Sequence, residues 1–148
     1  MTPGETVDDR IVRGIAEALH DTGAAVWRPT GTYQEDEAAI TVGGLPQSPA
    51  QAVALTTYGS EDDPALADSL VMVQATIRGS SDQRDANATA AALFDLLHGR
   101  EHFTLAGVPI VLAQRHSWAW LGVDGGGRWR RSDNYYLNVN NPTAHRRF

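Results

Sequence analysis

The 148-residue sequence contains no cysteine, no lysine and no long apolar run. Without cysteine the chain can form neither a disulfide nor a thiolate metal site, so packing must stabilise the fold. No apolar segment approaches the roughly 20 residues that a membrane-spanning helix needs, and Met1–Glu5 lacks the basic and apolar regions of a secretory signal. We therefore expect a soluble chain with no membrane partner, and a length that suits one domain over residues 1–148.

Charge is divided unevenly along the chain. The formal net charge is −6, but residues 1–74 contain 12 acidic residues and 3 arginines, whereas residues 75–148 contain 6 acidic residues and 9 arginines. A ring contact between identical copies joins two different patches and would use such an asymmetry, unless the two halves interleave in the fold. The use of arginine alone suits interfaces and ion pairs, although a coding bias would produce it too.

The C-terminal quarter predicts a β-hairpin. The turn sequence Asp124-Gly125-Gly126-Gly127 separates two segments, 108–120 and 129–139, that are rich in aromatic and branched residues. The alternative is a phosphate-binding loop, which needs a following helix and usually a Lys-Ser/Thr pair. Here Arg128 leads into a strand instead, so the hairpin is favoured.

Elsewhere helical and strand-like patterns alternate. Apolar residues spaced by four predict a first helix that stops before Gly23, and a second helix between possible caps at 80–82 and Gly99. The clearest strand is 70–79, where alternate residues should face the helices: Val71, Val73, Ala75 and Ile77.

Shorter segments complete this pattern. Residues 24–27, 38–42 and 51–58 are strand-like, and acidic loops are expected at 31–37 and 60–64. We expect an α+β fold with a single mixed, mainly antiparallel sheet of about four or five strands and two helices packed on one face.

No catalytic centre, cofactor site or metal site is predicted. His98 and His102 are four residues apart, but the intervening Gly99 should end the helix, so they do not share a helical face. The acidic clusters at 35–37 and 61–63 have no neighbouring histidine or lysine and are typical of solvated loops. We therefore expect a protein that is not an enzyme.

Aromatic and arginine side chains concentrate near the predicted hairpin: Trp118, Trp120, Arg128, Trp129, Arg130, Arg131, Tyr135 and Tyr136. They could form buried core, a protein interface or a nucleic-acid surface. The net negative charge disfavours nucleic acid.

The order of several segments resembles that of a known family. An N-terminal helix precedes a strand with Trp27, and four further segments follow it: Gly43-Gly44-Leu45-Pro46, Ala54-Leu55-Thr56-Thr57-Tyr58-Gly59, Val73-Gln74-Ala75-Thr76-Ile77-Arg78-Gly79 and Phe94-Asp95-Leu96-Leu97-His98-Gly99. Leu121-Gly122-Val123-Asp124 and Asn134-Tyr135-Tyr136-Leu137 complete the pattern. In this order the chain resembles the tail terminator proteins, also described as minor capsid proteins, of long-tailed (siphovirus-type) actinobacteriophages.

This resemblance implies a structural virion protein without cofactors. It implies a homo-oligomeric ring, expected to be a hexamer, that caps the major tail tube protein and meets a head-side neck or stopper protein. The location implied is the tail-neck junction, after assembly in the host cytoplasm. Other neck components (a connector, stopper or minor capsid protein) are the alternative, and a nucleic-acid module or a small hydrolase is less favoured. We expect four arginines to contact acidic residues of an adjacent subunit or the tail tube: Arg78, Arg128, Arg130 and Arg131.

Overall fold

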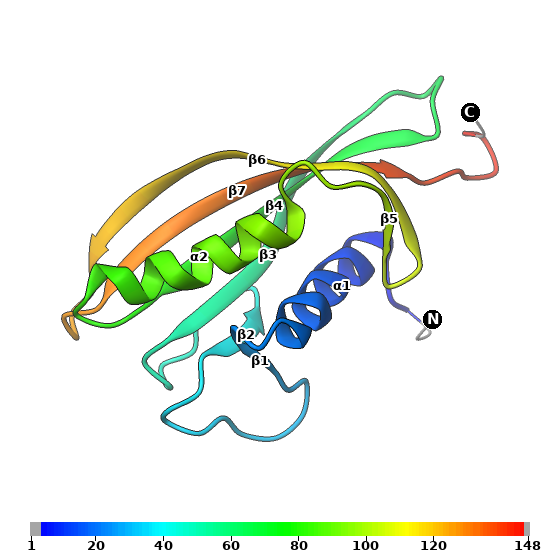
Figure 1. Cartoon of the computed structure of the whole chain (residues 1–148). Helices are drawn as coiled ribbons and strands as arrows, with labels where there is room; N and C mark the ends of the chain where they lie inside the picture. Colours follow the sequence, from blue (N-terminus) through cyan, green and yellow to red (C-terminus); the bar gives the residue numbers. More distant parts are fainter. Residues whose placement is uncertain (1–3, 147–148) are drawn as a thin grey trace.

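The computed structural model describes residues 4–146 as two helices and seven strands. Their bounds in chain order are α1 Val7–Asp21, β1 Val26–Trp27, β2 Ala39–Val42, β3 Ala52–Asp62, β4 Asp68–Arg78, α2 Gln83–Leu97, β5 Glu101–Leu105, β6 Val108–Val123 and β7 Trp129–Asn140. Figure 1 shows both helices on the same side of a long, twisted sheet. The expected α+β class and the C-terminal hairpin of β6 and β7 are confirmed.

The sheet has seven strands in the order β1-β2-β3-β4-β7-β6-β5. The two pairs among β1, β2 and β3 are parallel, and the other four pairs are antiparallel. The prediction of four or five strands was therefore wrong, although the mixed, mainly antiparallel character was right. The strand missing from the sequence pattern is β5, which follows directly after α2 and pairs with the start of β6.

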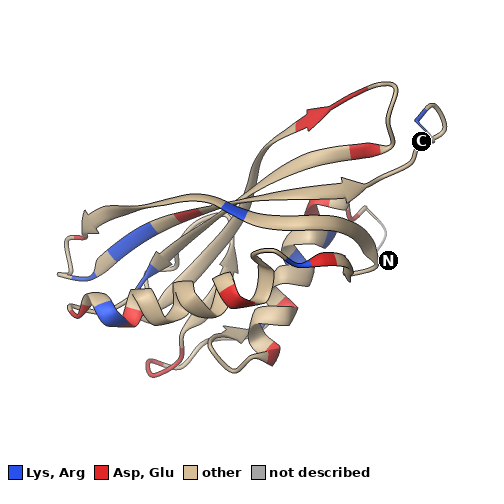
Figure 2. Ribbon diagram, turned by 45° about the horizontal axis from the view of Figure 1, so that its top comes forward, with Lys and Arg blue, Asp and Glu red and all other residues tan. Residues whose placement is uncertain are grey.

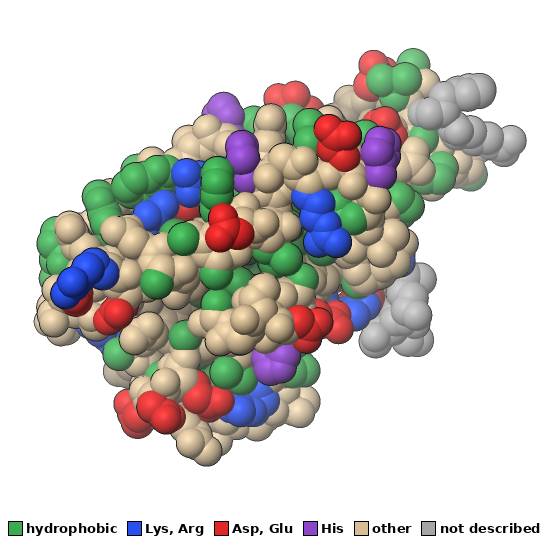
Figure 3. All heavy atoms as spheres, in the orientation of Figure 1, with side chains coloured by type: hydrophobic (Ala, Val, Ile, Leu, Met, Phe, Trp, Pro, Cys, Tyr) green, Lys and Arg blue, Asp and Glu red, His purple; other side chains and the backbone are tan. Residues whose placement is uncertain are grey.

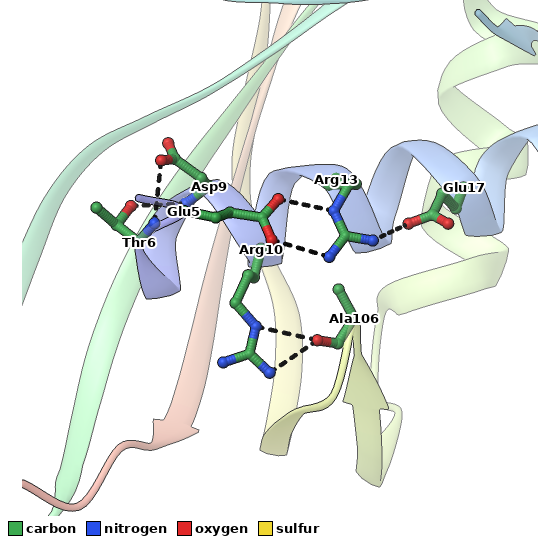
Figure 4. A network of polar contacts seen from close by, with 7 residues as sticks. All are labelled: Glu5, Thr6, Asp9, Arg10, Arg13, Glu17 and Ala106. Carbon is green, nitrogen blue, oxygen red and sulfur yellow. Dashed lines mark hydrogen bonds and ion pairs between the residues drawn. The ribbon is translucent and has the colours of Figure 1, made fainter. Parts of the chain in front are cut away.

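Helix α1 begins at a capping box. The Thr6 hydroxyl accepts from the Asp9 N–H at 3.1 Å, and the Asp9 carboxylate accepts from the Thr6 N–H at 3.2 Å. Figure 4 shows this cap beside a network in which Arg13 pairs with Glu5 and Glu17, both at 2.8 Å. The apolar stripe predicted from the sequence packs on the sheet through Ile11, Ile15 and Leu19.

A second contact ties α1 to the β5–β6 turn. The Arg10 guanidinium donates to the Ala106 carbonyl oxygen at 2.9 and 3.1 Å, as Figure 4 shows. Gly14 lies so close to this turn that an added Cβ would stand 2.7 Å from the Leu105 Cβ. The helix can approach β5 this closely only because Gly14 has no side chain.

Helix α2 covers the other half of the same face. Asp82 caps its N-terminus by accepting from the Arg84 N–H at 2.9 Å, and the predicted stripe is buried at Ala86, Ala90, Leu93 and Leu97. In β4 the residues expected to face the helices, Val71, Val73, Ala75 and Ile77, are all buried in the core cluster. The predicted register of this central strand is therefore confirmed.

The acidic segment 60–64 is mostly strand rather than turn. β3 continues to Asp62, where it pairs with Ser69 of β4, and only residues 63–67 connect the two strands. The sequence pattern missed this because a bulge between Thr57 and Gly59 shifts the register and breaks the alternation of apolar residues. The resulting β3–β4 hairpin projects beyond the helices (Figure 1).

Candidate functional site

The β6–β7 turn is held by Asp124. Its Oδ1 accepts from the Gly126 and Arg128 N–H groups at 2.9 and 3.0 Å, and its Oδ2 pairs with the Arg128 guanidinium at 3.0 Å. These bonds, with that from the Arg128 N–H first, hold the pKa of Asp124 at about 2. Gly127 has φ of 78°, a conformation that glycine adopts without strain. The turn therefore presents Arg128 as part of an ordered structure.

Arg78 stabilises a loop on the sheet face opposite the helices. Its side chain donates to the carbonyl oxygens of Ala50, Pro46 and Pro49 at 2.6, 2.7 and 2.8 Å, and it is only 6 % exposed. Burial and the nearby Arg128 lower its pKa from the usual arginine value. Arg78 thus has little surface left for a partner chain.

Arg130 lies beside Arg78, directly across from it in the β4–β7 register. Arg130 is half-buried, and its buried Nε has no hydrogen-bond partner among residues 4–146. Three of the four predicted interface arginines, Arg78, Arg128 and Arg130, therefore gather at one end of the sheet around a single carboxylate, that of Asp124.

Arg131 faces the helices instead. It forms two bonds to the fully buried Asp133 carboxylate, at 2.7 and 2.9 Å, and a third to Asn87 at 2.8 Å. Its guanidinium lies 3.8 Å from the centre of the Trp118 ring, a cation–π contact. Arg131 is thus fully engaged within its own chain.

The side chains around Arg131 line a groove of about 440 Å³ between α2 and β6, together with Phe94, Arg115 and Trp120. Figure 3 shows hydrophobic side chains around basic ones in this part of the surface. Trp118 is 42 % exposed at its rim. The aromatic and arginine cluster of the sequence is therefore partly core, at Tyr135, and partly surface.

The opposite end of the sheet is acidic. The β3–β4 hairpin carries Glu61, Asp62, Asp63 and Asp68, with Leu66 exposed between them at 48 %. Arg146 partly balances this charge, at 3.6 Å from Asp62. Figure 2 shows acidic residues in this hairpin and arginines near the β6–β7 turn at the other end of the strands.

The residues of the other acidic cluster, 35–37, have different surroundings. Glu37 pairs with Arg28 at 2.9 Å and accepts from the Gln34 N–H at 2.6 Å, and these bonds lower its pKa to about 2. Glu35 and Asp36 are exposed. Glu37 therefore closes the 28–37 loop, whereas its neighbours face solvent as the sequence indicated.

The two histidines considered as metal ligands have different surroundings. His98 is the C-cap of α2; its Nδ1 accepts from the Arg115 N–H at 3.0 Å and its ring stacks on Phe94. His102 lies in β5 with φ of 50°. Within residues 4–146 no group of three potential ligands is close enough to hold a metal ion. Nor does any helix in that range have the length and apolar character needed to cross a membrane.

No local pattern in the sequence predicts the free edge of β6. β6 has 16 residues, but β5 covers only its first part, up to Leu112. Leu121 and Val123, in the uncovered part, are 47 % and 46 % exposed. The mismatch in length between the two strands is a signal that the sequence contains, but it becomes visible only once β5 is recognised.

Comparison with protein families matches residues 18–141 to the family described as bacteriophage tail terminator protein. The chain belongs to this family. Its members are structural proteins of phage particles, as the resemblance noted in the sequence indicated. The comparison with curated protein sequences gave no match.

A solved structure supports the fold. One chain in the virion of a native gene transfer agent particle superimposes with a TM-score of 0.52 and 16 % sequence identity. The match covers 68 % of this chain and 77 % of that chain. At this identity the likeness concerns the fold.

Proposed function

We propose that this chain is a tail terminator that caps the phage tail tube as a closed ring of identical subunits, with six copies as the expected number. It contacts the major tail tube protein on one side and a head-side neck or stopper protein on the other, at the tail-neck junction, and it performs no catalysis. Membership of the tail terminator family and the fold of a virion component support this function. Assembly takes place in the host cytoplasm.

The observation that most supports a ring is the separation of charge along the sheet. β4 runs from Asp68 at the acidic hairpin to Arg78 beside Arg128 and Arg130. Ten steps of about 3.3 Å place these ends roughly 33 Å apart. A single subunit therefore presents two surfaces of opposite charge that cannot reach each other. Heterologous contacts, which close rings, join two such different surfaces on neighbouring copies.

Among the four arginines, Arg128 and Arg130 are the ones we assign to the contact. Both are partly exposed at the β6–β7 end, where their side chains can reach a partner chain. Arg78 and Arg131 hold the surrounding loop and strand in place through bonds within the chain. Exposed charges at the edge of an interface are screened by salt. They therefore affect the rate at which two subunits meet and the alignment in which they bind more than the affinity.

Another neck component, such as a connector, stopper or minor capsid protein, is the second candidate. It is consistent with the same virion neighbour, whose description names the particle alone. The two candidates differ in their effect on the tail: only a terminator sets its length. A nucleic-acid module is disfavoured, because the two basic residues of the aromatic groove, Arg131 and Arg115, both pair with the buried Asp133 carboxylate.

The test is tail length in a phage that lacks this chain and receives it from a plasmid. Electron microscopy should show tails of uniform length with the wild-type chain and of variable length with the double variant Arg128→Glu, Arg130→Glu. Partial rescue is expected from Glu61→Arg with Asp63→Arg. Arg84→Glu is the matched control, since Arg84 is an exposed arginine whose ion-pair partner is Asp82 in its own cap.

Circular dichroism and thermal melting must show that the double variant is folded, because Arg128 also pairs with Asp124 in the turn. A folded double variant that still yields uniform tails would contradict the assigned contact. Tails of uniform length in the complete absence of the chain would contradict the terminator function itself and favour another neck component.

A further inference from the structure

The second half of β6 is a free sheet edge. β7 pairs along the whole strand, but on the other side the last contacts are the Ala113 N–H to the Arg100 carbonyl at 3.0 Å and the Arg115 N–H to His98 at 3.0 Å. From His116 to Val123 the described part of the chain offers no backbone partner on that side. Unpaired backbone N–H and C=O groups on an edge strand are a template for pairing with another chain.

The side chains along this edge are unusual for an edge that remains in water. Trp118, Leu121 and Val123 are all among the exposed large hydrophobic residues, and the segment 116–123 contains no acidic residue, arginine or proline. Edges that must stay single normally carry charges or proline. Bulges at Arg115/Ser117 and Trp120/Gly122 twist the strand, which restricts pairing to a partner strand with a matching twist.

A second free edge lies diagonally opposite on the same chain. β2 pairs with β3 from Ala52 to Leu55 only, so the segment 56–62 of β3 has β4 as its single described strand neighbour. This segment is also twisted, by the bulge between Thr57 and Gly59. It ends in Glu61 and Asp62, whereas the free β6 edge, residues 116–123, contains no acidic residue. The two edges therefore differ in charge.

We infer that the free edge of β6 pairs with the free edge of β3 from a second copy of this chain, so that the sheets of neighbouring subunits become continuous. The inference rests on the proposed ring and names its contact. Within a chain β3 and β6 run in opposite directions, because three antiparallel pairings separate them. Copies that keep the same orientation around a ring therefore pair antiparallel at this junction.

The position of the two edges favours closure. The β3 edge lies at the hairpin end of the strands and the β6 edge at the turn end, so each copy is staggered along the strand direction relative to the next. Closed barrels need such a stagger, with strands tilted relative to the barrel axis.

Cysteine cross-linking tests this contact, because the native chain has no cysteine. Ser60→Cys marks the β3 edge, and Ser117→Cys, Ala119→Cys or Leu121→Cys marks successive positions on the β6 edge. A disulfide needs Cα atoms within about 7 Å, so the position that reacts reports the register. The control partner is Asp95→Cys, at an exposed site on α2 away from both edges.

Oxidation of a mixture of Ser60→Cys with at least one β6 variant should give a covalent dimer, and a chain carrying both cysteines should give a ladder up to the closed ring. Each single variant alone, and the mixture with Asp95→Cys, should remain monomeric on denaturing gels. Dimers from a β6 variant alone would overturn the inference in favour of a two-fold β6–β6 contact.

Light scattering and tail length separate failure of this contact from failure of the function. Rings or capped tails without any cross-link between the two edges would overturn the edge pairing and leave the terminator function intact. Absence of both rings and capped tails would contradict the function and, with it, the edge pairing.

Discussion

The centre of the sheet and its two free edges differ in how many of their backbone groups are hydrogen-bonded within the chain and in how many of their side chains are buried. In β4 and β7 both sides of each strand are paired, and Val73 and Tyr135 are buried under the helices. The Arg131 guanidinium is hydrogen-bonded to the buried Asp133 carboxylate. The edges at 56–62 and 116–123 have one strand neighbour each and expose Trp118. The centre therefore determines folding, and in the proposed ring the edges serve assembly.

The largest expected effect is at the centre of β4. Val73→Asp places a carboxylate without a partner in the core, and its cost of about 5 kcal/mol or more should prevent folding. Circular dichroism of the purified variant is the measurement. A Val73→Asp variant that is folded and melts cooperatively would contradict the distinction between centre and edge.

A slightly smaller effect is expected when the buried ion pair is broken. Asp133→Ala leaves Arg131 buried without its carboxylate, and we expect a loss of about 3–5 kcal/mol in the free energy of unfolding. Urea denaturation measures it. The control is Arg84→Ala, which removes an exposed ion pair and should cost about 1 kcal/mol or less.

The neighbouring face of β4 should be far more tolerant. Gln74 points away from the helices and donates to Ser132 and Asn134 at 2.9 and 3.2 Å. Gln74→Asp loses these donors, so we expect a folded protein destabilised by about 1 kcal/mol in the same urea experiment. The alternation of apolar residues alone would indicate a nearly neutral change, because it does not show these bonds. Damage equal to that of Val73→Asp would contradict the observed register.

The smallest effect concerns acid and the β6–β7 turn. The pKa of Asp124 is about 2 in the folded chain, against an ordinary aspartate value near 3.9 in the unfolded chain. A depressed folded pKa contributes stability that is complete above about pH 4 and is lost as pH falls through 2. Carboxyl NMR titration should show this midpoint, and Arg128→Gln should raise it. An unchanged midpoint in Arg128→Gln would exclude the Arg128 guanidinium as a cause and leave the backbone N–H groups of the turn.

The sequence predicted the elements whose pattern is set by burial. The four-residue stripe of α1 and the alternation of Val71, Val73 and Ala75 in β4 follow directly from one buried face, and the structure confirms both. β5 was missed because its five residues are mostly exposed and show no period. The extension of β3 through Glu61 was missed because strand pairing with β4, and not burial, fixes that segment.

The candidate site was predictable in composition but not in arrangement. Charge asymmetry along the sequence identified arginines that could form an interface, yet sequence alone could not separate Arg131, which binds Asp133, from the half-buried Arg130. That difference depends on which face of β7 each residue occupies and on which side chains lie opposite. The free edges depend on strand order, which no local pattern reports.

Mixing two assembly-deficient variants tests most directly whether one chain joins the next through two different surfaces. Ala119→Lys with Leu121→Lys charges the β6 edge, and Tyr58→Lys with Ser60→Lys charges the β3 edge, all at exposed positions. By native mass spectrometry, the wild-type chain should form closed rings, each variant alone should be monomeric, and the mixture should form dimers containing one copy of each variant and nothing larger. Rings formed by either variant alone, or a wild-type chain that stops at a two-fold dimer, would contradict the account.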